Sequence, residues 1–328
     1  SSAASDVYKR QIKDYPDFVE ICSYLTGNFS EPLSFSMRAY RALKERSDEF
    51  DLVIDNGSLA YGNLKIQKKL GLPILGIIHH PITVDRRLEL DNARTFLERL
   101  GKRRWYAFTR MQTRVCQKIQ RIITVSESSK EDISHDHKVD INKIHVVPIG
   151  IDTDFFAPQT NIERIPGRIV STASADVPLK GQKFLLEAIA KVRNDFPHVH
   201  LELVGKQREG STTAETLNQL GLDDIVRFNQ GISYKELVNL LASAEVAIVP
   251  SLYEGFSIPA IEALSCGAPL IASTGGALPE VAGPHLETCL AVPPGDSDAL
   301  ADQIKYCLLY TSDAADEGLG VDLGGRRI

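Results

Sequence analysis

From about residue 50 onward, short apolar runs alternate with longer amphipathic segments, and no other feature constrains the fold as strongly. The apolar runs are short and bounded by turn residues, so each is expected to form a buried strand. Amphipathic segments of helical period between such strands are typical of β-α units and a parallel sheet. The sequence therefore predicts an α/β fold.

The expected strands form two series with a linker between them. The linker, residues 151–167, has no strong period and carries turn residues and two prolines. Two doubly wound, Rossmann-like domains that face a cleft are expected, one over 12–155 and one over 156–306. Ligands of such sheets bind beyond the carboxyl ends of the strands. The expected strands are residues 51–56, 73–78 and 121–126 in the first series and 168–174, 200–205, 225–230, 245–250, 269–274 and 289–294 in the second.

Helices are expected between most of these strands, because apolar residues recur at intervals of three and four. The charged stretch 91–120 shows the same spacing and predicts one long helix or a broken pair. In the second series the expected helices are residues 182–194, 213–220, 234–244 and 257–266.

The two ends of the chain differ from what they flank. Residues 1–11 and 307–328 lack helical or strand periodicity, and the second segment is rich in Gly, Asp and Ala. Both resemble translated sequencing-adaptor read-through, which predicts that they are non-native, that the protein is a fragment cut at both ends and that its first domain is incomplete. A disordered natural terminus is the alternative.

Composition limits the class of protein. A net charge of -6 argues against nucleic-acid binding, which needs a concentrated basic surface. The five cysteines are scattered and lack C-x-x-C spacing, which favours reduced thiols over disulfides or zinc ligands. No apolar run approaches the roughly 20 residues of a membrane-spanning helix. A cytoplasmic protein is expected, with peripheral contact at the inner face of a membrane left open.

The densest motif is PSLYEGFSIPAIEALSCGAPLIASTGGALPEV, residues 250–281. Glu254 is expected before a helix and Glu262 one to two turns inside it. The unpaired N–H groups of Phe256, Ser257 and Ile258 at the helix start would suit a phosphate or a sugar hydroxyl. Taken alone, Glu254 could merely complement the helix dipole and Glu262 could be a solvated helix residue.

This block resembles the Glu-x7-Glu signature of family 4 glycosyltransferases, and PSLYEGF, EAL, CGAPLIAS and GGALPE all match. A weaker resemblance runs from about residue 50 to 306. It implies a GT-B fold and retaining transfer of a sugar from a nucleoside-diphosphate sugar to an acceptor hydroxyl, without a metal or another cofactor. In agreement, the Asp-x-Asp pattern at Asp152 and Asp154 lies in the linker.

The resemblance also assigns residues to the donor. Glu254 would hold the hydroxyls of the transferred sugar, and Glu262 would bind the ribose diol. The backbone of the turn at Gly255 and of residues 256–258 would contact the sugar and the diphosphate. Glu280, in GGALPE, is given a supporting role, with a capping or surface carboxylate as the alternative.

Lys180 precedes an expected helix, where its ammonium can reach the donor phosphates. A solvated lysine is the alternative without the family match, which is to a Lys-Gly dipeptide that neutralises the leaving diphosphate. The family usually has an arginine about five residues earlier, where this chain has Ala175 and Asp176. That departure weakens the expected clamp on the diphosphate.

In the first domain, His79 and His80 directly follow an expected strand. Relatives place a histidine there in contact with the donor sugar, and His79 is favoured by its position at the strand end, with His80 as the alternative. The glycine-rich loop that closes over the donor phosphates in relatives is expected before Ile12 and is missing. Weak donor binding and poor turnover are expected of the chain as it stands.

The stretch from Arg99 to Arg121 contains no acidic residue and interleaves basic with aromatic side chains. Relatives use first-domain helices to approach anionic membranes or lipid-linked acceptors, and a simple solvated face is the alternative. The acceptor could be lipid-linked or a polysaccharide. Three other functions stay open: a nucleotide-sugar epimerase, a phosphorylase and a noncatalytic nucleotide-binding relative.

Overall fold

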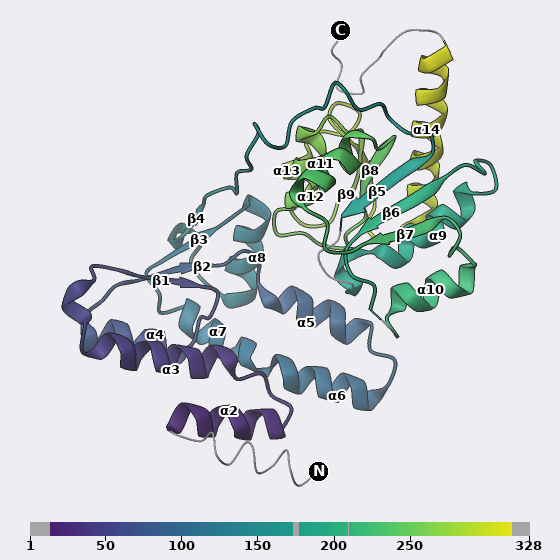
Figure 1. Ribbon diagram of the computed structural model, residues 1–328. Helices are drawn as coiled ribbons and strands as arrows, with labels where there is room; N and C mark the ends of the chain where they lie inside the picture. The colour runs from purple at the N-terminus through teal and green to yellow at the C-terminus, as the bar shows by residue number, and fades with distance from the viewer. Residues whose placement is uncertain (1–13, 173–176, 209, 317–328) are drawn as a thin grey trace. The chain divides into compact units, whose positions relative to one another are not determined.

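The computed structural model describes residues 14–172, 177–208 and 210–316. The chain divides after Pro148 into two compact units. Each unit contains a parallel β-sheet with helices packed around it (Figure 1). The expected α/β class with two Rossmann-like units is confirmed.

The sheet of the first unit has the strand order β1-β2-β3-β4, and all neighbours are parallel. Its first three strands fall inside the predicted apolar runs, and β4 follows them. The strands are β1 (Val53–Asn56), β2 (Ile74–Ile77), β3 (Arg121–Thr124) and β4 (Ile144–Val146). The surrounding helices are α2 (Tyr15–Leu25), α3 (Glu31–Lys44), η1 (Ser47–Glu49), α4 (Tyr61–Lys65), η2 (Ile66–Leu70), α5 (Ile82–Asp91), α6 (Phe96–Trp105), η3 (Tyr106–Phe108), α7 (Thr109–Cys116), α8 (Glu127–His137) and η4 (Ile141–Lys143).

The stretch predicted as one long helix or a broken pair is broken. Helix α5 ends at Asp91, and the side chain of Thr95 accepts a hydrogen bond of 3.1 Å from the backbone N–H of Glu98 to start α6. A 3-10 turn at Tyr106–Phe108 then separates α6 from α7. Local capping thus divides a segment whose apolar period alone does not show where it breaks.

The sheet of the second unit has the order β10-β9-β8-β5-β6-β7. The order reverses beside β5, so β5 and β8 flank the topological switch point of a doubly wound sheet. All six strands lie within the predicted runs. They are β5 (Arg168–Thr172), β6 (His200–Val204), β7 (Val226–Asn229), β8 (Val246–Val249), β9 (Leu270–Ser273) and β10 (Leu290–Val292).

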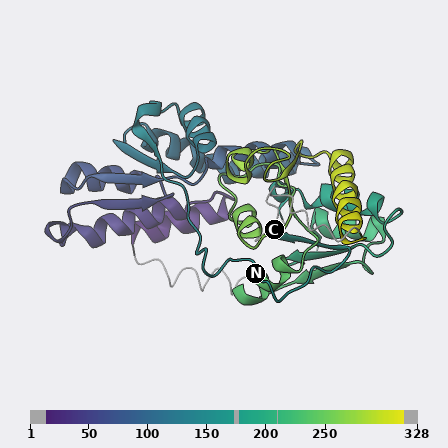
Figure 2. The same ribbon diagram turned by 90° about the horizontal axis from the view of Figure 1, so that it is seen from above.

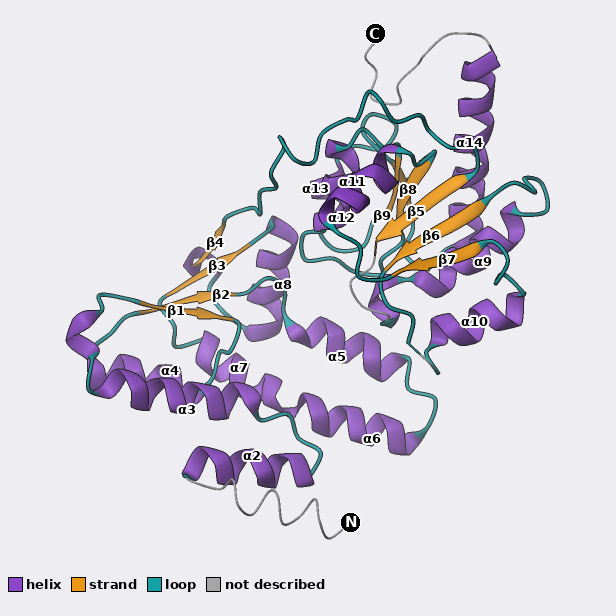
Figure 3. Ribbon diagram, in the orientation of Figure 1, coloured by secondary structure: helices purple, strands orange, loops and turns teal. Residues whose placement is uncertain are grey.

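Helices cover both faces of this second sheet (Figure 3). Helices α9 (Gln182–Val192), α10 (Thr212–Leu220) and α14 (Ser297–Asp316) pack on one face around Leu185, Leu217 and Ile304. On the other face, α11 (Tyr234–Ala242), α12 (Ile258–Ser265) and α13 (Leu278–Ala282) surround a second core that includes Leu241, Ala260 and Leu278. Among the described residues, no helix is both long and apolar enough to cross a membrane.

The expectation that the tail after Tyr306 lacks helical periodicity is wrong as far as Asp316. Helix α14, the yellow helix in Figure 1 and Figure 2, runs through this boundary. Cys307 and Leu308 are 1% and 2% exposed and belong to the core beneath the helix. The burial of these two side chains carries the helix past the expected boundary, and the glycines of the tail lie outside the described residues. Whether residues 307–328 are native stays a prediction.

The packing of α14 is testable with two adjacent leucines. Leu308→Ala should lower the free energy of unfolding by about 2–5 kcal/mol, because it removes a buried side chain. Leu309→Ala is the matched control and should change it by less than about 0.5 kcal/mol, since Leu309 is 55% exposed. Urea denaturation followed by circular dichroism measures both, and equal effects would contradict the packing of α14.

Candidate functional site

Three loops meet at the carboxyl ends of neighbouring strands in the second unit. They follow β5, β8 and β9, which lie side by side in the sheet. The loop after β5 carries Lys180, the loop after β8 carries Glu254, and the loop after β9 carries Gly275 and Gly276. Residues from separate parts of the sequence are therefore collected at the switch point, where doubly wound sheets bind ligands.

Close backbone contact joins the first two loops. The backbone N–H of Leu252 donates to the carbonyl oxygen of Leu179 at 2.8 Å. A Cβ atom on Gly181 would lie 2.0 Å from the carbonyl oxygen of Pro250, and Gly181 has a φ of +65°. Only glycine satisfies both the space and the conformation.

The loop after β9 is joined in the same way. The N–H of Ala277 donates to the carbonyl oxygen of Glu254 at 2.8 Å, and Glu254 forms a parallel β-bridge with Gly276. A Cβ on Gly276 would lie 2.3 Å from that oxygen. The hydroxyl of Ser273 donates to the carbonyl oxygen of Ser251. The turn that carries Glu254 is thus fixed from both sides.

Lys180 and Glu254 form an ion pair inside this arrangement. The Lys180 Nζ lies 2.8 Å from Glu254 Oε1, and their side chains are 18% and 10% exposed. The hydroxyl of Ser251 donates to the same Oε1 at 2.7 Å. The alternative of a fully solvated lysine is wrong. Sequence reasoning missed Ser251, although its position directly after a buried strand was a usable signal.

Several polar groups at the start of α12 have no partner among the described residues. Within the described part of the chain, the backbone N–H groups of Phe256, Ser257 and Ile258 have no acceptor. Ser257 is 4% exposed, its hydroxyl also has no partner there, and its φ is +87°. Such a backbone costs about 1–3 kcal/mol and is found where the surroundings enforce it, often at functional sites.

Glu262 lies inside α12 and is 7% exposed, so the alternative of a solvated helix residue is wrong. Its carboxylate has no hydrogen-bond or ion-pair partner among the described residues. Burial raises the pKa of Glu262 because a charged carboxylate loses solvation. Burial and the Glu262 charge together raise the pKa of the Cys266 thiol to about 11. A buried carboxylate of this kind gains from a ligand that donates hydrogen bonds.

Two further residues near the site, Glu280 and Gln182, differ in how well the sequence predicted them. Glu280 is exposed in the first turn of α13, a placement that also suits the surface-carboxylate alternative. Gln182, which no motif indicated, is 6% exposed next to Gly181, and its Oε1 has no partner in the described structure. The substituted positions Ala175 and Asp176 lie outside the described residues.

In the first unit, His79 and His80 follow β2 as expected. The His79 ring is exposed, and its Nε2 lies 3.0 Å from Oδ1 of Asn56 at the end of β1. The His80 Nε2 lies 2.8 Å from Oδ2 of Asp85 on α5. His79 therefore projects beyond the sheet edge, whereas His80 is tied to the helix that follows. Asn56, which sequence reasoning missed, fixes the ring of His79.

Two family models match consecutive parts of the chain. The model described as "Glycosyltransferase Family 4" matches residues 4–155, and the one described as "Glycosyl transferases group 1" matches residues 166–309. An MMP alpha-(1->4)-mannosyltransferase from Mycolicibacterium hassiacum is 47% identical over 290 residues, which cover 88% of this chain and 69% of the relative. The chain belongs to the family 4 glycosyltransferases.

More distant relatives and solved structures agree with this membership. A D-inositol 3-phosphate glycosyltransferase from Mycolicibacterium smegmatis is 31% identical over 203 residues, or 58% of this chain and 44% of the relative. A sucrose-phosphate synthase from Thermosynechococcus elongatus superposes with a TM-score of 0.69 at 25% identity, covering 89% of this chain and 70% of that one. Anabaena HepE, solved with UDP and glucose, shares the fold with a TM-score of 0.65 at 19% identity, covering 84% and 73%. This family 4 glycosyltransferase has a GT-B fold.

Gly181 should be irreplaceable because its φ is positive and because a side chain would clash with Pro250. A second glycine separates these two effects. Gly221 also has a positive φ, +60°, but a Cβ there would meet nothing within 4 Å. Gly221→Ala should therefore cost only the backbone strain of about 1–2 kcal/mol. Gly181→Ala adds a clash with Pro250 and should cost clearly more. Thermal denaturation of both variants measures the difference, and equal losses would contradict the close contact.

Glu262 should make stability depend on pH in a defined direction. Its pKa is raised in the folded state, so the unfolded chain loses this proton first as pH rises from about 4.3. The free energy of unfolding then falls as pH rises, until pH passes the raised pKa of Glu262 in the folded state. Glu262→Gln should therefore melt at a higher temperature than the parent at pH 7 without ligand, and the difference should shrink toward pH 4. An unchanged difference across this range would refute the effect.

Proposed function

We propose that this chain carries out retaining, metal-independent mannosyl transfer from a nucleoside-diphosphate mannose to a sugar hydroxyl. The observation that carries the proposal is the Lys180–Glu254 pair beside the unpartnered start of α12, at the switch point of the sheet. The mannosyl group is inferred from the 47% identical relative, which is named as a mannosyltransferase.

Donor binding would exchange partners within this pair. The Lys180 ammonium would move from Glu254 toward the diphosphate, whose charge is larger. Glu254 Oε1 would then accept a hydrogen bond from a mannose hydroxyl while it keeps the one from Ser251. Because the loops are fixed by backbone contacts, the exchange needs only side-chain motion. The site would hold charge that develops on the leaving diphosphate without large reorganisation.

The start of α12 would bind the rest of the donor. The N–H groups of Phe256, Ser257 and Ile258, with the turn at Gly255, would donate to the diphosphate or the sugar. The buried hydroxyl of Ser257 would gain a partner. Glu262 would accept hydrogen bonds from both ribose hydroxyls, which are donors suited to a buried carboxylate. Glu280 would support the adjoining loop.

Retention follows if donor and product share their anomeric configuration. Nucleoside-diphosphate mannose carries an α-linked sugar, and the mannosyltransferase relative is named for an α-(1→4) linkage. Metal independence rests on Lys180 and the helix start, which would neutralise the leaving group in place of a divalent cation. Among the described residues, no group of three or more His, Cys, Asp or Glu side chains is placed to hold a metal.

In the first unit, His79 would contact the transferred sugar, with its ring oriented by Asn56. The hydrogen bond from His80 to Asp85 instead gives that histidine a positioning role at the start of α5. The assignment favours His79 over His80 for contact with the substrate.

The test is calorimetric titration of the chain with GDP-mannose, UDP-glucose and ADP-glucose. We expect saturable binding of GDP-mannose, because a family relative is named as GDP-mannose-dependent. Lys180→Met should weaken binding of GDP at least tenfold, since one charge-assisted contact to the diphosphate is lost. Lys183→Met is the matched control and should bind as the parent does, because Lys183 is an exposed helix residue near Glu187.

Turnover separates the remaining parts of the proposal. Mannose transfer to an α-mannoside acceptor, followed by NMR of the product, should give only the α anomer and should persist in EDTA. Glu254→Gln should lower kcat far more than it weakens binding of free GDP, because GDP lacks the sugar. A β product, or activity that needs added Mn²⁺, would refute retention or metal independence respectively.

A further inference from the structure

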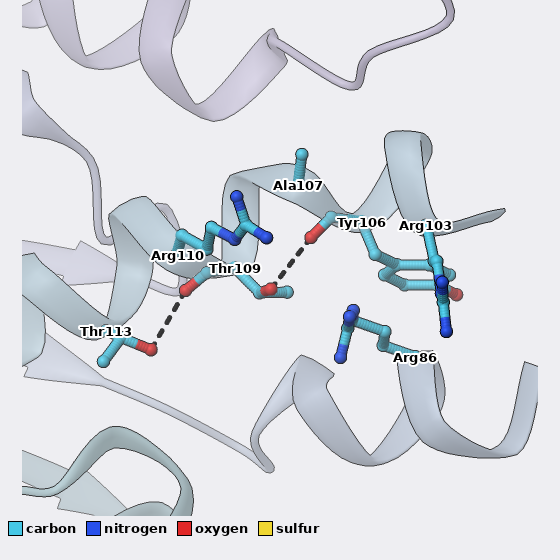
Figure 4. Close-up of a pocket in the computed structure, with 7 residues that line it drawn as sticks. All are labelled: Arg86, Arg103, Tyr106, Ala107, Thr109, Arg110 and Thr113. Atoms are coloured by element: carbon cyan, nitrogen blue, oxygen red, sulfur yellow. Dashed lines mark hydrogen bonds between the residues drawn. The ribbon is translucent and has the colours of Figure 1, made fainter. Parts of the chain in front are cut away.

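The first unit contains a pocket lined by three arginines (Figure 4). Its volume is about 330 Å³, and it lies among α5, the α6–η3 segment and α7. The lining residues are Arg86, Arg103, Tyr106, Ala107, Thr109, Arg110 and Thr113. No residue of the donor site described above belongs to it. A pocket of this size accommodates a small charged group together with part of the molecule that carries it.

This arginine pocket carries positive charge that no ion pair within the described structure offsets. No acidic residue lines it, and Arg86, Arg103 and Arg110 form no ion pair there. The neighbouring Arg87, by contrast, pairs with Asp136 at 3.0 Å. Three cations around one space repel one another, so an anion between them would lower the electrostatic energy.

Nearby carboxylates are already engaged by other side chains. Asp85 on α5 is hydrogen-bonded to His80 at 2.8 Å, and Glu89 on the same helix pairs with Lys102 at 2.9 Å. Neither lines the pocket. Asp85 and Glu89 could therefore turn to the arginines only by breaking these contacts.

The remaining polar group of the pocket suits an anion as well. Burial and the charges of Glu89 and Asp85 raise the pKa of Tyr106 to about 12. Its phenol therefore stays protonated at neutral pH and remains a hydrogen-bond donor. The hydroxyls of Thr109 and Thr113 donate to backbone carbonyl oxygens, as the dashed lines in Figure 4 show. Recognition would rest on three guanidinium groups and one phenol, all of them donors.

The pocket also has a defined relation to the strand-end histidines. Helix α5 begins two residues after His80, at the carboxyl end of β2, and Arg86 lies on its second turn. The hydrogen bond between His80 and Asp85 fixes the helix beside Arg86. An anion in the pocket would thus be held on the element that leaves the reactive edge of the first sheet.

We propose that Arg86, Arg103 and Arg110 bind a phosphate group carried by the acceptor. Guanidinium groups match phosphate oxygens with paired hydrogen bonds, which a lysine cannot provide. The inference rests on the proposed glycosyl transfer and adds the chemical class of its acceptor. The phosphate could belong to a soluble sugar phosphate or to the headgroup of a lipid, and the chemistry at the arginines is the same.

The first experiment titrates the full chain with inorganic phosphate and with myo-inositol 1-phosphate, monitored by NMR chemical shifts at constant ionic strength. Saturable binding is expected. Arg86→Gln and Arg110→Gln should each weaken it about tenfold, as expected for loss of a charge-assisted contact. Arg99→Gln removes the same charge from an exposed position on α6 outside the pocket and should weaken it less than twofold.

A second arm distinguishes the two sources of phosphate. Vesicles of phosphatidylcholine with and without phosphatidylinositol are sedimented with the parent chain and with Arg86→Gln. Binding that requires phosphatidylinositol, is competed by inositol 1-phosphate and is lost in Arg86→Gln assigns a lipid headgroup. Binding of the soluble ester without any preference for these vesicles assigns a soluble acceptor.

The proposal is overturned by several results. No saturable phosphate binding in either arm would overturn it, as would equal weakening by Arg99→Gln or vesicle binding that Arg86→Gln leaves unchanged. Thermal denaturation of each variant shows that it is folded, and Arg110, which is exposed, provides a variant with little risk to folding. GDP-mannose binding by the same samples separates the two proposals. Donor binding without phosphate binding refutes only this inference, and phosphate binding without donor binding refutes the glycosyl transfer.

Discussion

The carbonyl oxygen of Pro250 occupies the space that a side chain at position 181 would need. This contact brings the loops after β5 and β8 together at the switch point, and the hydrogen bond from Leu252 to Leu179 holds them there. Gly275 and Gly276 allow the loop after β9 to approach the same turn from the other side. The backbones of three loops therefore meet at positions where larger residues would push them apart. The site depends on this close contact.

The two glutamates of the site differ in their electrostatics. Glu254 is held beside Lys180 and Ser251, so its charge is compensated before any ligand arrives. Glu262 is equally buried but has no partner in the described structure, and burial raises its pKa. A compensated carboxylate can exchange one partner for another at low cost. A buried carboxylate without a partner gains most from hydroxyl donors. The charged form of Glu262 is disfavoured without a ligand, which is consistent with a binding role rather than a structural one.

Sequence patterns predicted the strands of both sheets except β4, because a buried parallel strand needs a continuous apolar run, which is visible directly. They also placed Glu254, His79 and Lys180 after strands and Glu262 inside the helix that follows Glu254. Patterns did not show that Lys180 and Glu254 pair, since those residues are 74 positions apart and only the sheet order joins them. The continuation of α14 was missed because burial of Cys307 and Leu308 depends on α9 and on strands far away in the sequence. Contacts of this kind have no local signature.

The two cationic sites differ in a way that fits their proposed partners. The diphosphate of a donor becomes a leaving group and must later depart, and it faces one lysine, a compact charge on a flexible stem that can return to Glu254. An acceptor phosphate would take no part in the reaction and would only need to stay in one orientation. Several guanidinium groups from different helices suit that purpose, because paired hydrogen bonds fix direction as well as distance. A lysine that can return to Glu254 would suit a diphosphate that must leave, and fixed arginines would suit a phosphate that stays bound.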